Sequence, residues 1–263
     1  MAESWENQQV RSFALKPRAS NPSSNVISDS TNCPPGLGAQ VDGPAEARGG
    51  VSRSKRGLDL ACILAAAPLV VPLGLLIALM VKLVSPGPAL FQQQRVGYRG
   101  RRFRCLKFRT MAVNADTGVH AGHMVDLMKS GRPMAKLDAV GDSRLIPGGR
   151  LLRCCGLDEL PQLINVFRGE MSLVGPRPCL AYECEHYQPR HWQRFGTPPG
   201  LTGLWQVNGK NRTTFEEMMD LDLYYVRHKS LLLDLSIIAR TIPAIVQQVM
   251  DQRRNHKPVS CAQ

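Results

Sequence analysis

The 263-residue sequence lacks the signatures of several common protein classes. It has no G-x-G-x-x-G or G-x-x-x-x-G-K-S/T string, which argues against a Rossmann dinucleotide site and a Walker-type phosphate loop. The eight cysteines form no C-x-x-C pair and, together with the six histidines, show no spacing typical of zinc. We therefore expect reduced cytoplasmic thiols. Aromatic residues make up only 6% of the chain, and no motif of interleaved aromatic and basic residues points to nucleic-acid binding.

Acidic residues are few beside basic ones, 21 against 33, which leaves a formal charge of +12. A balance of this sign is typical of proteins that meet nucleic acid or an anionic membrane surface. Residues 1–50 add nothing to it, since they hold four basic and five acidic side chains. They are rich in Ser, Asn, Pro and Gly without a helical or strand period. We therefore expect residues 1–52 to form a disordered polar tail without a signal peptide.

A long apolar run occupies residues 60–81, which include no charged side chain. At about 1.5 Å per residue, an unbroken helix of this length would just cross a bilayer core of about 30 Å. Pro68 and Pro72 interrupt the run, and proline kinks a helix. Both flanks are basic, and the positive-inside tendency assigns such flanks to the cytoplasm. The residues leave two readings open for 53–84: a helix that bends and returns to the same side, and a kinked helix that crosses.

A basic β-hairpin is predicted next, with strands over 89–96 and 102–108 around the turn 97–100. Its charges are all of one sign: Arg95, Arg99, Arg101, Arg102, Arg104, Lys107 and Arg109. Such a hairpin would lie well against anionic head groups, and some of its residues could bind a phosphorylated substrate. A solvated face that serves only solubility is the third reading. Residues 113–141 are weakly patterned, and we expect a loop with a short helix there.

An adjacent pair of acids, Asp158 and Glu159, is predicted at the start of a helix over 156–167. Gly156 is an acceptable N-cap, acidic residues suit a first helical turn, and apolar residues 160, 163, 164 and 167 share one face. The pair could simply complement the helix dipole. Arg150 and Arg153 precede it, however, and a helix N-terminus offers free N–H groups to a phosphate.

Three further segments have a recognisable pattern, and two of them carry candidate binding residues. Pro176 and Pro178 hold Arg177 in a stiff extended backbone, which suits bidentate phosphate binding. The segment 198–211 reads as a loop of turn residues and amides that could contact a base or sugar, with Gln206, Lys210 and Asn211 as candidates. Residues 230–250 are amphipathic and broken at Pro243, which fits a helix in the membrane interface and nearly as well an ordinary core helix.

Together these features point to phosphate transfer at a membrane surface. An aspartate can attack phosphorus and split one displacement into two. Its neighbouring glutamate could assist proton transfer or help to hold a metal. Mg²⁺ usually binds through one or two carboxylates and substrate phosphates, which makes Asp158 a candidate ligand.

Residues 55–249 resemble the bacterial sugar transferases known as monotopic phosphoglycosyl transferases, or polyprenyl-phosphate sugar-phosphate transferases. The resemblance rests on many strings in order along the chain. They are Lys55-Arg56 with Asp59, Pro72, Ser85-Pro86-Gly87-Pro88, Arg95-Val96-Gly97, Lys107-Phe108-Arg109-Thr110-Met111, Leu157-Asp158-Glu159-Leu160-Pro161-Gln162, 169–178 and Pro199-Gly200-Leu201-Thr202-Gly203.

The resemblance implies transfer of a sugar 1-phosphate from a UDP-sugar to undecaprenyl phosphate, with release of UMP, as the first membrane step of exopolysaccharide or other surface-glycan assembly. It implies an aspartyl phosphosugar intermediate on Asp158, with Glu159 beside it and Mg²⁺ required. It also implies a re-entrant helix kinked at Pro72 in the bacterial inner membrane, with the active site on the cytoplasmic side. Arg177 would hold a phosphate, and Lys107, Arg109, Arg150 and Arg153 are further candidates.

The expected fold is therefore an α-rich α+β monotopic membrane protein. Its segments are a polar tail (1–52), a re-entrant helix (53–84), a catalytic domain with a basic hairpin and interfacial helices (85–250), and a basic tail (251–263). Expected partners are the two substrates and anionic lipid, not nucleic acid; a homo-oligomer and the identity of the sugar stay open. The chain departs from the family pattern at Gly156, where Ser or Thr is usual, at Lys210, where Arg is frequent, and at Ile146 and Pro147. A catalytically idle membrane scaffold is the alternative, against which the intact acid pair speaks.

Overall fold

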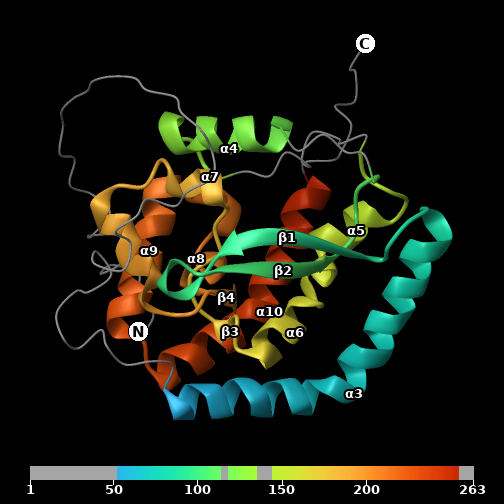
Figure 1. Ribbon diagram of the computed structural model, residues 1–263, viewed down its shortest axis with the longest axis horizontal. Helices are drawn as coiled ribbons and strands as arrows, with labels where there is room; N and C mark the ends of the chain where they lie inside the picture. Colours follow the sequence, from blue (N-terminus) through green and yellow to red (C-terminus); the bar gives the residue numbers. More distant parts are fainter. Residues whose placement is uncertain (1–51, 114–117, 135–143, 255–263) are drawn as a thin grey trace. The chain divides into compact units, whose positions relative to one another are not determined.

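The computed structural model describes residues 52–113, 118–134 and 144–254, all within one compact unit of the chain (Figure 1). Apart from Ser52, the predicted N-terminal tail lies outside the described residues, as does most of the predicted C-terminal tail. The fold is rich in helices, with two small sheets, as the expected α+β class requires. Its helices are α3 (Arg53–Val84), α4 (Gly118–Ser130), α5 (Gly149–Cys154), α6 (Gln162–Arg168), α7 (Ala181–Cys184), α8 (Leu204–Val207), α9 (Phe215–His228) and α10 (Leu231–Arg254). The strands are β1 (Leu90–Val96), β2 (Arg102–Phe108), β3 (Ser172–Val174) and β4 (Gly200–Thr202), and short 3₁₀ turns include η4 (Leu157–Glu159), η5 (Pro189–Gly196) and η6 (Lys210–Arg212).

The predicted hairpin is confirmed. Strands β1 and β2 pair antiparallel, with Leu90 opposite Phe108 and Val96 opposite Arg102. The turn includes Arg99 at φ 54°, next to Gly100 at φ 71°. Strand β2 turns Cys105 and Phe108 into the core, so the hairpin is attached to the rest of the unit along this strand.

The second sheet is a short parallel pair, β3 and β4, that the sequence did not predict; β4 lies in the segment 198–211, which was predicted to be a loop. The backbones of the two strands approach closely where the sheet ends. A Cβ atom on Gly200 would lie 2.1 Å from the backbone nitrogen of Gly175, so only glycine fits at this position. Strand β3 leads directly into Pro176 and Arg177, and its pairing with β4 therefore fixes where the Pro-Arg-Pro segment begins.

Helix α3 is continuous from Arg53 to Val84 and contains both Pro68 and Pro72. Its ribbon changes direction along its length, between the blue and the teal parts in Figure 1. Many large apolar side chains of this helix face away from the rest of the described chain: Leu64, Leu69, Val71, Leu75, Leu76, Leu79 and Leu83. By length and composition it is one of two described helices that could cross a membrane, the other being Leu231–Asp251 within α10.

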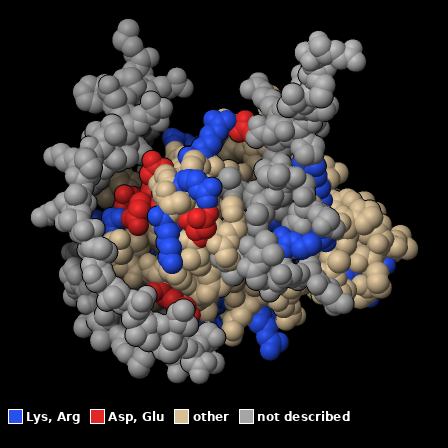
Figure 2. Space-filling model, turned by 90° about the horizontal axis from the view of Figure 1, so that it is seen from above, with Lys and Arg blue, Asp and Glu red and all other residues tan. Residues whose placement is uncertain are grey.

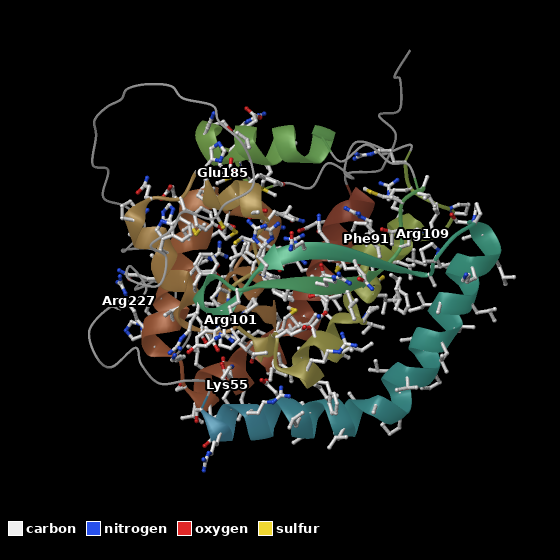
Figure 3. All side chains as sticks on the ribbon, viewed as in Figure 1. Lys55, Phe91, Arg101, Arg109, Glu185 and Arg227 are labelled. Atoms are coloured by element: carbon white, nitrogen blue, oxygen red, sulfur yellow. The ribbon has the colours of Figure 1, made fainter. Side chains whose placement is uncertain are left out.

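Polar groups attach the N-terminal end of α3 to the unit. Lys55 Nζ lies 2.7 Å from Asp234 Oδ2 on α10 and donates to the Tyr225 hydroxyl of α9 at 3.0 Å. One turn later, Asp59 accepts a hydrogen bond of 2.8 Å from Ser172 Oγ at the start of β3. Figure 3 marks Lys55 at this end of the helix. The basic pattern that indicated membrane topology in the sequence therefore also has a structural role.

Apolar contacts attach the C-terminal end of α3 to the same unit. Ile77 and Val81 are buried in a cluster with Phe108 of β2, with Leu152 of α5 and with Ile146, which precedes α5. Both ends of the helix are thus packed against the protein, whereas the middle presents apolar side chains outward.

Helix α10 differs from the prediction, because it continues through Pro243 instead of breaking there. A proline removes its own N–H from the helical ladder and crowds the preceding turn, but contacts near both ends attach this helix to the unit. Asp234 near its start is buried in the pair with Lys55, and Gln248 near its end donates to the carbonyl of Cys154 on α5. Leu232 and Ile242 lie outward, 81% and 71% exposed.

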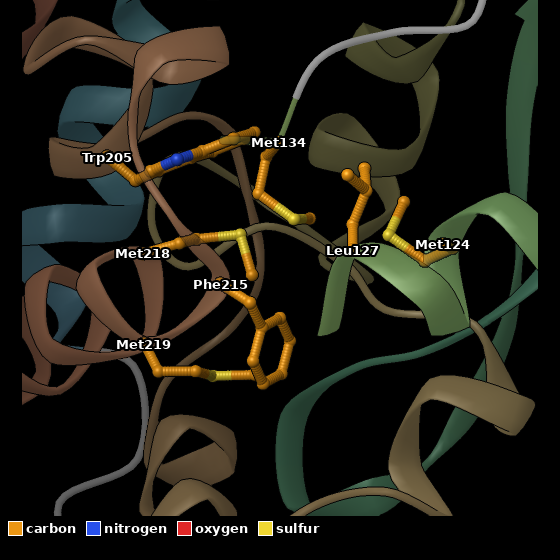
Figure 4. Close-up of a cluster of buried hydrophobic side chains, with 7 residues drawn as sticks. All are labelled: Met124, Leu127, Met134, Trp205, Phe215, Met218 and Met219. Atoms are coloured by element: carbon orange, nitrogen blue, oxygen red, sulfur yellow. The ribbon is translucent and has the colours of Figure 1, made fainter. Parts of the chain in front are cut away.

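Methionines dominate one part of the core (Figure 4). Met124 and Leu127 of α4, together with Met134, pack against Trp205 of α8 and against Phe215, Met218 and Met219 of α9. The short helix expected within 113–141 is therefore present as α4, and unbranched methionine side chains fill the irregular space beneath it.

We predict that Lys55→Met lowers the free energy of unfolding by about 3–5 kcal/mol, because the buried Asp234 carboxylate loses its partner. Chemical unfolding in detergent micelles, followed by tryptophan fluorescence, measures the change. Arg190→Met is the matched control, since Arg190 pairs with Glu216 and Asp220 at the surface, where removal of a pair costs less than about 1 kcal/mol. Equal losses in the two variants would contradict the prediction.

Candidate active site

The acid pair lies on the 3₁₀ turn η4, between α5 and α6, and not in the first turn of a helix as predicted. Gly156 adopts φ 69°, a left-handed conformation typical of the residue that ends a helix. It therefore terminates α5 instead of capping α6, which begins only after Pro161. Asp158 is buried, with 7% of its surface exposed, and the side chain of Glu159 is one third exposed.

The four apolar residues that were predicted to share one face differ in burial. Ile164 and Phe167 of α6 are exposed, whereas Leu160 and Leu163 are partly buried. The buried side of α6 includes Asn165, whose side chain accepts from the Leu106 N–H and donates to the Arg104 carbonyl of β2. Ile164 and Phe167 therefore present an apolar surface outward.

Lys107 of β2 binds directly to the acid pair. Its Nζ donates to Glu159 Oε1 at 2.8 Å, and both side chains are partly exposed. The strand thus helps to fix the position of the glutamate. Lys107 was one of the sequence candidates, and the structure gives it a specific partner.

Lys210 of η6 lies within electrostatic reach of the same groups. Burial lowers its pKa, the carboxylates of Glu159 and Asp158 partly offset this effect, and Lys107 and Arg177 add to it. The charges of four residues that are distant from Lys210 in the sequence therefore act on this ammonium. Within the described part of the chain, the Lys210 ammonium makes no hydrogen bond.

Arg177 is held by a partner that the sequence reasoning missed. Its Nη1 donates to Glu183 Oε2 at 3.0 Å, and Glu183 is almost fully buried. The backbone of Arg177 is fixed as well, because its carbonyl accepts from Arg194, which also pairs with Asp222 at 2.6 Å. Glu183 lies on the single-turn helix α7, which is too short to give a periodic signal in the sequence.

Glu183 is ionised in this setting. Burial by itself would raise its pKa, but the neighbouring guanidinium groups of Arg177, Arg95 and Arg194 outweigh burial, so its pKa lies below the usual value. The buried carboxylate therefore neutralises part of a cluster of arginines and orients Arg177.

The remaining sequence candidates lie on several different elements. Arg150 and Arg153 lie on α5, directly before η4, and Asn211 is next to Lys210 on η6. Arg109 lies elsewhere, buried beside the C-terminal end of α3, where it donates to the Ser85 carbonyl (Figure 3). Gln206 lies on α8, and its buried Oε1 accepts no hydrogen bond from the described residues.

The charges of the molecule are not segregated everywhere. On the face seen from above, basic and acidic side chains stand next to one another (Figure 2). Exposed ion pairs of this kind include Arg132 with Asp126 and Arg190 with Asp220.

The donor set at the acid pair fits Mg²⁺. Among the described residues, no three His, Cys, Asp or Glu side chains gather as a metal cluster would require. Mg²⁺ commonly needs only one or two carboxylates, since substrate phosphates and water complete its shell. Asp158 and Glu159 can supply these carboxylates.

The acid pair and its basic neighbours, together with the outward-facing apolar helices, define a class of protein: an enzyme that handles phosphate groups next to such helices. The chain belongs to the bacterial sugar transferase family, whose model matches residues 51–248. The two apolar helices and the membrane-linked reactions of the relatives indicate that it associates with a membrane.

Several curated proteins are similar over most of the chain. The exopolysaccharide production protein ExoY of Sinorhizobium fredii is 39% identical over 213 residues, 78% of this chain and 90% of that protein. A UDP-glucose:undecaprenyl-phosphate glucose-1-phosphate transferase of Caulobacter vibrioides is 41% identical over 74% of this chain and 71% of its own length. An undecaprenyl-phosphate galactose phosphotransferase of Salmonella typhimurium is 34% identical over 74% of this chain and 40% of its own length. The chain is therefore a transferase.

We predict that Glu183→Gln reduces stability at pH 7 and flattens its dependence on acid. A carboxylate with a lowered pKa contributes stability that is complete above its unfolded value and is lost as pH falls through the folded pKa. Unfolding free energies at neutral and acidic pH should therefore converge for wild type and Glu183→Gln as pH falls. The exposed Glu185→Gln is the control, and a constant difference between wild type and Glu183→Gln across pH would contradict the role given to Glu183.

Proposed function

We propose that the protein transfers a sugar 1-phosphate from a UDP-sugar to undecaprenyl phosphate and releases UMP. The observation that carries the proposal is the acid pair Asp158–Glu159, with Lys107 bonded to Glu159 and Lys210 within electrostatic reach of both acids, in a chain of the sugar transferase family. The names of the Caulobacter and Salmonella relatives support the substrates, and that of the Sinorhizobium relative supports a role in exopolysaccharide assembly. The product would be undecaprenyl-diphosphate-sugar, the first lipid-linked intermediate of a surface glycan.

The reaction proceeds in two displacements at one phosphorus atom. An oxygen of the Asp158 carboxylate attacks the phosphorus that carries the sugar, and the bond from this phosphorus to the bridging oxygen breaks, so UMP leaves with that electron pair. A phosphate oxygen of undecaprenyl phosphate then attacks the same phosphorus and displaces the Asp158 carboxylate. The enzyme returns to its initial state, and no oxidant or further reactant is needed.

The surrounding charges suit this chemistry. The diphosphate and the acceptor phosphate are both anionic, and the cations Lys107, Lys210 and Arg177 offset their repulsion from the Asp158 carboxylate. Lys107 also holds Glu159, which keeps this second acid in a defined position beside the first. Mg²⁺, bound by Asp158 and Glu159, would supply further neutralisation of the diphosphate.

We propose that α3 is a re-entrant helix, which enters the inner membrane from the cytoplasmic side and returns to it. A straight helix of 32 residues would be about 48 Å long, and a crossing helix would place its two ends on opposite sides. The contacts of Lys55 and of Val81 with the same compact unit support a return to one side. The outward apolar side chains of α6 and α10, such as Phe167 and Leu232, support an interfacial position of these helices among anionic lipids.

We predict that Asp158→Asn lowers UMP release by about 10³-fold or more, because the nucleophile of the first displacement is lost. The assay combines a panel of UDP-sugars with undecaprenyl phosphate and Mg²⁺. Glu185→Gln, an exposed carboxylate without a role in the site, should keep the wild-type rate. Wild-type activity in Asp158→Asn would exclude this residue as the nucleophile, and inactivity of the wild type with every donor would exclude the transferase.

A separate prediction concerns topology. Single cysteines placed at the exposed positions Ser54 and Leu90, in a background without the native cysteines, should both react with an impermeant maleimide only after the cytoplasmic side is opened. The measurement uses inverted membrane vesicles and intact cells. Labelling of the two positions from opposite sides would show that α3 crosses the membrane.

A further inference from the structure

The backbone of Lys210 is unusual. Its φ is +37°, and among the described residues only Arg99 shares a positive φ without being glycine. The left-handed region is costly for a residue with a side chain, so surrounding contacts must hold it there. Gly209, at φ +119°, leads the chain into this conformation. The position of the Lys210 ammonium therefore depends on what fixes this short turn.

Two hydrogen bonds in series, here called the relay, connect Trp205 through Thr213 to the backbone of Lys210. The indole Nε1 of Trp205 donates to Thr213 Oγ1 at 2.6 Å, and Thr213 Oγ1 donates to the carbonyl of Lys210 at 2.9 Å. The direction is unambiguous, because an indole N–H only donates and a carbonyl only accepts. The single hydroxyl proton of Thr213 is thus committed to Lys210.

The relay begins in rigid structure. Trp205 is buried in the cluster of methionines and aromatics with Met134 and Met218 (Figure 4). Thr213 is held a second time through its backbone, since its carbonyl accepts from the Met134 N–H at 2.8 Å. The core beneath α4 is therefore connected, through one hydroxyl group, to the lysine whose ammonium is within electrostatic reach of Glu159 and Asp158.

We propose that Trp205 and Thr213 are positioning residues that hold Lys210 in place to bind the diphosphate of the nucleotide-sugar donor. The inference rests on the proposed function, because the diphosphate is the anionic group of that donor. Neither residue touches the reacting atoms. Their effect is on donor binding, since they determine where the ammonium stands before the donor arrives.

The test compares Thr213→Val with Thr213→Ser in the full-length protein. Valine keeps the shape of threonine but loses both hydrogen bonds, whereas serine keeps the hydroxyl and loses the methyl group. We expect Thr213→Val to raise the KM for the UDP-sugar about tenfold, which corresponds to the binding free energy of one hydrogen bond to a charged group. The kcat and the KM for undecaprenyl phosphate should change by less than about twofold. Thr213→Ser should stay within about twofold of wild type in every constant.

A double variant separates positioning from packing. Lys210→Met should raise the donor KM at least as much as Thr213→Val, and the double variant should add nothing, because both changes remove the same interaction. Thermal melting in micelles checks that each variant is folded at the assay temperature. The proposal is overturned if Thr213→Ser is as impaired as Thr213→Val, if Thr213→Val matches wild type, or if the two losses add.

Failure of the proposed function has a different outcome. If the wild type releases no UMP from any donor, the proposed transferase activity is wrong. The positioning role of Thr213 can still be tested by calorimetric titration of the same variants with UDP. Weaker UDP binding in Thr213→Val than in Thr213→Ser supports the relay. Equal binding in the two variants overturns it.

Discussion

Lys55 Nζ and Asp234 Oδ2 lie 2.7 Å apart in a buried junction of α3 and α10, with the Tyr225 hydroxyl of α9 bonded to both. A buried charge without a partner is strongly unfavourable, so these three helices must meet in this arrangement or not fold correctly. The arrangement fixes the start of the longest apolar helix against the unit. It also brings Asp59 to Ser172 at the start of β3, the strand that leads to Arg177.

The candidate active site is assembled from short elements attached to this framework. Asp158 lies on a single 3₁₀ turn, Lys107 at the end of a hairpin strand, Arg177 after a three-residue strand and Lys210 on another 3₁₀ turn. Short turns have little stability of their own, so buried partners determine the geometry. Glu183 does this for Arg177, and in our proposal the core beneath α4 does it for Lys210.

Strong local patterns predicted the structure well, and weak ones did not. The hairpin around residues 97–100 was correct because strand preference and turn residues agree there. The helix predicted over 156–167 is present only as α6, and its predicted start at Gly156 was wrong, because a glycine can end one helix as readily as it can begin another. The burial of Asn165 in α6 was not predicted, because it depends on a hydrogen bond with the Leu106 N–H of β2, 59 residues distant in the sequence.

The family, the acid pair, the apolar segment with its two prolines and the basic flanks could all be identified from the sequence, because each depends on residues that are close together along the chain. The sequence did not reveal which charges meet, and the fold brings together Lys107 with Glu159, Arg177 with Glu183 and Lys55 with Asp234. These pairs depend on where distant elements pack. A buried charge is stabilised most when its partner lies within hydrogen-bond distance, and no local pattern records that distance.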